Sequence, residues 1–182
     1  VFDGVPRTLR DQRTNDVFTA AGQSRVLTGR VVTNGKPVRV TLTWTDAPGS
    51  TIGNSYNNDL DLVVGAGGQT YYGNVFSGSN SATGGSRDVR NNTESVFLPV
   101  GTTGAVVITV RASNINSDGV PNYGGALDQD FALVAYNVEE ASLPVIVSAG
   151  GGTASESCAI TNEAIDPDEF VTVLFALRND GS

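Results

Sequence analysis

Apolar and polar residues alternate with a period of two along much of the first 137 residues. In one such stretch Val38, Val40 and Leu42 alternate with polar side chains, which is typical of a strand with one buried face. Further strand candidates, separated by Gly, Asn and Pro, are residues 25–33, 59–64, 70–73, 95–100, 106–112 and 131–136. The pattern predicts an all-β fold, a jelly roll or β-sandwich of about eight antiparallel strands over residues 24–137.

The regions that flank this predicted domain are more polar. Residues 1–23 carry Arg7, Arg10 and Arg13 at helical spacing but no apolar stripe, and we expect them to form a connecting arm. Residues 138–145 combine small, charged and Pro residues, which is typical of a linker.

The last part of the chain, residues 146–182, contains two strand candidates at 146–149 and 170–177. A long loop rich in Gly, Ser and acidic residues joins them and includes Cys158, the single cysteine. We interpret this part as the N-terminal portion of a truncated, Ig-like second module. The abrupt start at Val1 suggests a piece of a longer chain.

Charge and composition restrict the possible chemistry. The chain has 19 acidic and 11 basic residues, a net charge of -8 and no His. Without an imidazole, a Ser-His-Asp triad, a Cys-His pair and a His-ligated zinc site are excluded. The acidic balance argues against a nucleic-acid partner, and no apolar run approaches the roughly 20 residues of a membrane helix. Chemistry based on acidic oxygens, such as a calcium or magnesium site, stays open.

Three oxygen-rich segments lie next to predicted strands. Asp46 follows one strand, Asp59 and Asp61 lie on the same side of another, and the segment from Asp88 to Glu94 leads into a third. Hard divalent cations prefer about six to eight oxygen ligands, which these segments can supply if their strand ends meet. The alternative is that the Asp and Asn residues cap turns and expose solvated charge.

Five segments in order resemble one known family: VTLTWTDAP at 40–48, NDLDLVV at 58–64, YGN at 72–74, RNNTESVF at 90–97 and DFALV at 130–134. Together they look like the C-terminal jelly-roll domain, a P-domain-like β-barrel, of secreted bacterial subtilisin-like serine proteases. The resemblance covers residues 25–137. The Gly-, Ser- and Asn-rich insertion at residues 77–86 departs from the family's pattern.

The resemblance implies a secreted, non-catalytic, calcium-binding accessory domain that stabilises or docks a subtilisin-like catalytic domain ahead of it. It carries over seven candidate calcium ligands: Asp46, Asn58, Asp59, Asp61, Asp88, Asn92 and Glu94. The acid-rich stretch at residues 162–169 likewise looks like the start of the Ig-like modules that follow such barrels.

Other acidic motifs are weaker candidates for an ion site. Residues 114–119 imitate the first oxygens of an EF-hand loop, but Gly125 stands where the bidentate Glu should be, so we expect a turn. Asp128 and Asp130 form a second D-x-D pair, which we expect to be solvated at the start of a strand.

Two other classes of function are alternatives to the accessory domain. A carbohydrate- or protein-substrate-binding module would need an exposed aromatic strip, for which Tyr71, Tyr72 and Tyr123 are the candidates, whereas Trp44 lies on the apolar side of its strand. Catalysis within this chain is the weakest hypothesis, because the sequence shows no general base beyond carboxylates and no activated nucleophile.

Overall fold

The computed structural model describes residues 3–125, 127–141, 146–157 and 170–179. The chain divides into two compact units, Val1–Ala141 and Ser142–Ser182, which are described separately below. The boundary between them falls inside the segment that the sequence predicts as a linker. Within the described ranges, no helix has the length and apolar character needed to cross a membrane.

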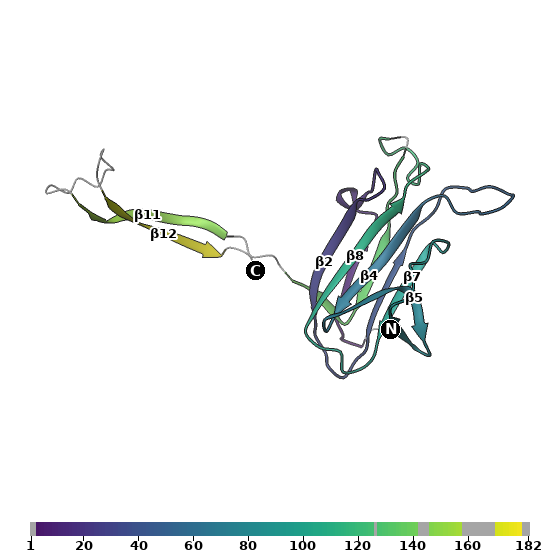
Figure 1. The fold of residues 1–182 in the computed structure, drawn as a ribbon, viewed down its shortest axis with the longest axis horizontal. Helices are drawn as coiled ribbons and strands as arrows, with labels where there is room; N and C mark the ends of the chain where they lie inside the picture. The colour runs from purple at the N-terminus through teal and green to yellow at the C-terminus, as the bar shows by residue number, and fades with distance from the viewer. Residues whose placement is uncertain (1–2, 126, 142–145, 158–169, 180–182) are drawn as a thin grey trace. The chain divides into compact units, whose positions relative to one another are not determined.

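The first unit consists of two antiparallel sheets (Figure 1). The four-stranded sheet has the order β1-β9-β3-β7, and the six-stranded sheet has the order β10-β2-β8-β4-β5-β6. The strands are β1 (Arg7–Asp11), β2 (Ser24–Val31), β3 (Val38–Thr43), β4 (Asp59–Ala66), β5 (Gln69–Ser77), β6 (Asn80–Thr83), β7 (Thr93–Leu98), β8 (Ala105–Asn114), β9 (Ala132–Tyr136) and β10 (Val138–Glu140). A short 3₁₀ helix, Thr14–Asp16, follows β1.

The inward faces of both sheets form one apolar core. Val40 and Leu42 of β3 are fully buried with Leu60 and Leu62 of β4, and Ile108 of β8 joins the same cluster. Because side chains alternate across a strand, the period-two pattern of the sequence corresponds to this burial. The prediction of an all-β, antiparallel sandwich is confirmed, and eight strands, β2–β9, lie between residues 24 and 137.

The N-terminal segment differs from the expected connecting arm. Its strand β1 pairs with β9 from Arg7 opposite Tyr136 to Asp11 opposite Ala132, so it is an edge strand of the four-stranded sheet. An edge strand needs no strict apolar alternation, because only part of it faces the core, and Leu9 is 59% exposed. The polar composition therefore concealed a strand.

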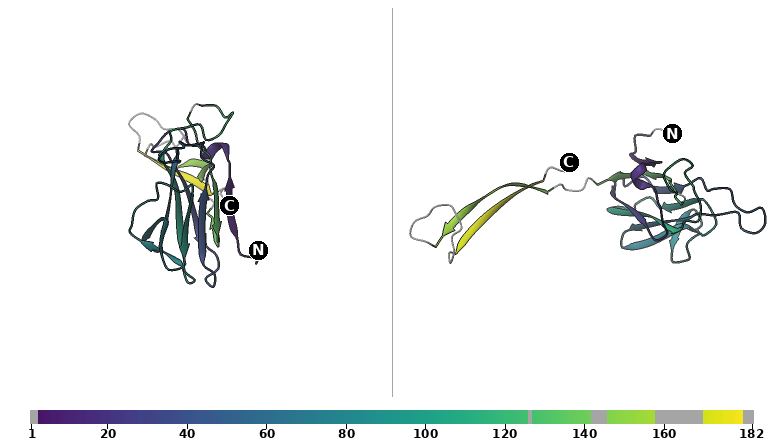
Figure 2. Two further views of the ribbon diagram at one scale, coloured as in Figure 1. Left: turned by 90° about the vertical axis from the view of Figure 1, so that its right-hand side faces the viewer. Right: turned by 90° about the horizontal axis from the view of Figure 1, so that it is seen from above.

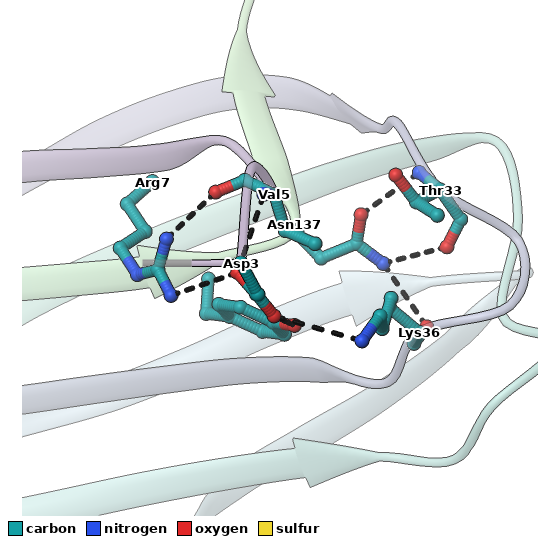
Figure 3. A network of polar contacts seen from close by, with 7 residues as sticks. Asp3, Val5, Arg7, Thr33, Lys36 and Asn137 are labelled. Atoms are coloured by element: carbon teal, nitrogen blue, oxygen red, sulfur yellow. Dashed lines mark hydrogen bonds and ion pairs between the residues drawn. The ribbon is translucent and has the colours of Figure 1, made fainter. Parts of the chain in front are cut away.

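A network of polar contacts holds the start of this segment (Figure 3). The Asp3 carboxylate accepts hydrogen bonds from the Tyr136 hydroxyl, the Val5 amide and Arg7, and it lies 3.6 Å from Lys36 Nζ. The hydrogen bond from the Tyr136 hydroxyl is the largest influence on the pKa of Asp3, which is well below its ordinary value.

The end of the first unit changes sheets at Asn137, whose φ of 64° breaks the extended chain between β9 and β10. The Asn137 side chain accepts a hydrogen bond from the Thr33 amide and donates to the carbonyls of Thr33 and Lys36 (Figure 3). Beyond it, β10 pairs with β2, so residues 138–140 are part of the six-stranded sheet rather than of a linker.

The second unit contains two antiparallel strands, β11 (Ile146–Glu156) and β12 (Val171–Asn179). Two register shifts interrupt their pairing, one of them beside the glycines of β11. Several β12 side chains are exposed, including Phe175 at 79% and Leu177 at 71%. Cys158 and the acid-rich stretch at 162–169 lie outside the described residues.

Candidate functional site

Strand β4 carries the pair of aspartates. Leu60 and Leu62 point into the core, and alternation therefore places Asp59 and Asp61 on the opposite face of the strand. That face is covered as well, since Asp59 is only 8% exposed and Asp61 only 1%. Both carboxylates are thus removed from most of the solvent that would stabilise their charge.

Strand β5 makes room for a third carboxylate. It pairs with β4 only as far as Tyr72, and the chain then turns through Gly73 to Asn74, which has a φ of 60°. The Asn74 side chain accepts a hydrogen bond from the Ser95 amide at 3.0 Å and donates to the Thr93 carbonyl at 2.9 Å. Asn74 thereby fixes the backbone of β7 on both sides of Glu94.

Glu94 faces inward, on the same side of β7 as Val96 and Leu98, and is 1% exposed. Its Oε2 accepts a hydrogen bond of 2.7 Å from the Leu62 amide of β4. A β carbon at Gly73 would lie 2.1 Å from the same oxygen, so only glycine leaves space for this carboxylate. The Glu94 carboxylate thus accepts the hydrogen bond of the Leu62 amide at the point where β5 no longer pairs with β4.

Asp59, Asp61 and Glu94 form an acidic cluster, and two of its oxygens lack hydrogen-bond partners. Asp61 Oδ1 and Glu94 Oε1 are buried, and neither has a hydrogen-bond partner among the residues that the structure describes. The other Asp61 oxygen, Oδ2, accepts a hydrogen bond from the Ser113 hydroxyl and lies 3.6 Å from Arg87 Nε. A buried oxygen without a partner is costly, and its usual complement is a proton or a cation.

The acid strengths of the three carboxyls reflect their burial. Burial, opposed by the Leu62 amide and reinforced by the charges of Asp61, Asp88 and Asp59, raises the pKa of Glu94 from 4.5 to about 8. Burial and the charges of Asp61 and Asp88 raise the pKa of Asp59 from 3.8 to about 6. Burial also raises the pKa of Asp61, although Ser113 and two arginines oppose the shift. The cluster therefore resists carrying its full negative charge.

Asp88 lies at the edge of this cluster. It accepts hydrogen bonds from the side chains of Asn74 and Asn91 and from the amides of Arg90 and Asn91. Its burial acts to raise its pKa, but these hydrogen bonds together lower it below its ordinary value. Asp88 is therefore a negative charge fixed by hydrogen bonds beside three carboxyls whose pKa values are raised.

The remaining three candidate ligands have other roles in the structure. Asp46 accepts hydrogen bonds from the amides of Asn57, at 2.6 Å, and Asn58, at 3.0 Å, and so closes the base of the long connection between β3 and β4. That connection extends away from the two sheets (Figure 2). Asn92 donates to the Trp44 carbonyl at 3.1 Å.

Asn58 is a buried structural amide. Its Oδ1 accepts hydrogen bonds from the amides of Asn116 and Ser117 and from the Ser117 hydroxyl. Its Nδ2 donates to the carbonyls of Ser117 and Asp128 and to Gln129 Oε1. These bonds use the hydrogen-bonding capacity of the amide, which leaves no lone pair directed at an ion.

Of the weaker acidic motifs, residues 114–119 and Asp128, only Asp128 differs from the expectation. Asn114 ends β8, and residues 115–119 form a loop that Asn58 anchors. Asp128, expected to be solvated, is fully buried, and its Oδ1 accepts a hydrogen bond from the Val120 amide. Asp128 also holds the end of this loop through its main chain, because the Gly119 amide donates a hydrogen bond to the Asp128 carbonyl.

Four residues that assemble the cluster were not among the candidate ligands: Arg87, Ser113, Gly73 and Asn74, of which the last two lie in the YGN segment of the resemblance. A glycine inside a strand often marks a place where another group approaches the backbone closely, and at Gly73 that group is the Glu94 carboxylate. The three tyrosines proposed as an exposed strip do not form one. Tyr71 packs against the core, Arg87 lies over the ring of Tyr72, and Tyr123 belongs to the loop after β8.

Among the residues that the structure describes, no group of three or more His, Cys, Asp and Glu side chains is arranged so that it could hold a metal ion. Comparison of the sequence with protein-family models and with curated proteins gives no match.

Proposed function

We propose that the first unit is a non-catalytic, calcium-binding accessory domain and that Asp59, Asp61 and Glu94 hold the cation with help from Asp88. The observation that supports this most is the pair of buried oxygens, Asp61 Oδ1 and Glu94 Oε1, without partners in the described structure. Both oxygens belong to carboxylates whose negative charges repel one another, and a cation would give each oxygen a partner of opposite charge.

Calcium fits this donor set better than other metals. The chain has no His, and its one Cys lies far along the sequence, so the soft and nitrogen ligands typical of zinc are missing. Carboxylates arriving from three separate segments form a flexible, all-oxygen shell, which calcium accepts and magnesium tolerates less readily. Water or main-chain carbonyls would complete the coordination.

The accessory role follows from the resemblance of five ordered segments to the C-terminal domains of secreted subtilisin-like proteases. The chain contains no His, so a protease triad has to lie in another polypeptide segment. In this proposal the protein is extracellular and the domain, rigidified by calcium, stabilises or docks the catalytic domain of the same protein. The alternative is a carbohydrate- or protein-substrate-binding module, and the packing of Tyr71 against the core makes an exposed strip of the three tyrosines a weaker basis for it.

Thermal unfolding of the full chain, followed by fluorescence of its single tryptophan, tests the calcium claim. Calcium at a hundredfold excess over its dissociation constant should stabilise the wild type by about 2.7 kcal/mol relative to EDTA. Asp61→Asn should abolish this increment while keeping the hydrogen bond with Ser113. Asp118→Asn, a change of the same charge at an exposed position, is the matched control and should retain it. Equal melting temperatures of the wild type in calcium and EDTA would refute the proposal.

A further inference from the structure

The acidic cluster already has a positive charge beside it. Arg87 Nε lies 3.6 Å from Asp61 Oδ2, and its charge lowers the pKa of both Asp59 and Asp61. Arg111, opposite Asp61 in the β4–β8 register, adds to the effect on Asp61 from an exposed position. Arg87 is therefore the cation in closest contact with the carboxylates that the proposed function assigns to calcium.

The two partners of this ion pair are held very differently. The Asp61 side chain is 1% exposed and bonded to Ser113, whereas the Arg87 side chain is 37% exposed. The guanidinium lies over the ring of Tyr72, with Cζ 5.5 Å from the ring centre, a weak contact at a surface position. The carboxylate is thus fixed, while the guanidinium can rotate into solvent.

The backbone next to Arg87 is fixed as well. Asp88 is tied by Asn74, Asn91 and the Arg90 amide, so the segment does not need to move when the Arg87 side chain leaves. The arginine is therefore a tethered cation that stays at high effective concentration near the site.

We infer that Arg87 is an internal counter-cation: it neutralises the carboxylates when no metal is bound, and a divalent cation must displace it to bind. This inference rests on the proposed function and concerns what sets the affinity and selectivity of that site. A monovalent ion has the same charge as the guanidinium and is not tethered, so it gains little by replacing Arg87. A divalent ion carries twice the charge of the guanidinium, so it gains more from the same carboxylates.

The ion pair between Arg87 and Asp61 offsets part of the negative charge of the cluster. Removal of the guanidinium should leave the apo protein with less compensated negative charge and thus a greater tendency to take up any cation.

Isothermal titration of calcium into the metal-free full chain tests the inference with three variants. Arg87→Gln should bind calcium about fivefold more tightly than the wild type, the effect of losing one partly exposed ion pair. Arg90→Gln removes the same charge from the same exposed segment without touching Asp61, and its affinity should change little. Arg87→Lys keeps the charge and should stay near the wild type. Sodium chloride should raise the melting temperature of metal-free Arg87→Gln more than that of the wild type.

The outcomes separate the inference from the function on which it rests. If the wild type binds calcium and Arg87→Gln binds it equally or more weakly, the inference about Arg87 is overturned and the calcium site stands. If Arg87→Gln and Arg90→Gln tighten binding alike, the effect is general charge and the inference fails. If neither the wild type nor Arg87→Gln binds calcium, the proposed function itself fails. Binding by Arg87→Gln alone would support the displacement in its strongest form.

Discussion

Replacing Glu94 by Gln gives the sharpest test of how the acidic cluster works. The amide has the size of the carboxyl, and its oxygen can still accept the hydrogen bond from the Leu62 amide. Its NH₂ group occupies the position of the partnerless oxygen and carries no negative charge. Glu94→Gln therefore imitates a permanently protonated Glu94.

The size of the effect follows from the pKa of Glu94, which is raised from 4.5 to about 8. Below pH 4.5 the folded and unfolded states both hold the proton, and the stabilising contribution is fully present. As the pH rises, the unfolded state ionises first, and the contribution is lost until the folded state ionises near pH 8. At about 1.4 kcal/mol for each pKa unit, the loss is roughly 5 kcal/mol, a large part of a typical unfolding free energy.

Guanidinium unfolding in EDTA at pH values from 5 to 9, followed by tryptophan fluorescence, measures this loss. The wild type should lose stability across the range, whereas Glu94→Gln should lose much less, and near pH 8 the variant should be the more stable protein. In saturating calcium the order should reverse, because the variant lacks one ligand charge. Glu139→Gln, at an exposed pair with Arg30, is the control and should follow the wild type. A variant that is less stable in EDTA at pH 8, with an unchanged pH slope, would refute the reasoning.

Two further substitutions separate the site from its scaffold. Gly73→Ala places a β carbon against the Glu94 carboxylate, so it should lower the free energy of unfolding by about 2 kcal/mol and abolish calcium binding. Gly35→Ala is the control, because the space around Gly35 is open, and it should change the free energy of unfolding by no more than about 0.5 kcal/mol. Asn58→Ala removes a fully bonded buried amide and should cost about 3 kcal/mol in denaturant titrations, with the calcium increment unchanged. An Asn58→Ala variant that loses only the calcium increment would show that Asn58 is a ligand after all.

Most of the sandwich could be predicted from the sequence because burial and strand periodicity coincide there. Leu60 and Leu62 alternate with aspartates, and the core takes the leucines. The exceptions have a physical reason. Strand β6, Asn80–Thr83, has no apolar face that the sequence pattern could reveal. Strands β1 and β10 are short edge strands that pair with strands far away in the sequence.

The candidate site was predictable only in its parts. The segments that carry Asp59, Asp61, Asp88 and Glu94 could be named from residue type and resemblance, but their meeting depends on a turn in β5 and on a side chain from another sheet. Oxygen content alone also fails to distinguish a ligand from a buried cap, as Asn58 shows. What covers a strand face is set by loops, and loops leave little periodic trace in a sequence.

The clamp at Asn137 has a mechanical consequence. Because β9 and β10 belong to different sheets and the residue between them is bonded to the turn at Thr33 and Lys36, tension on the chain beyond Ala141 acts on the six-stranded sheet first. A pull there has to break the short β10 pairing and then the Asn137 bonds before any strand of the four-stranded sheet is loaded. The C-terminal exit of the sandwich therefore yields in steps, and the four-stranded sheet stays intact while the first contacts break.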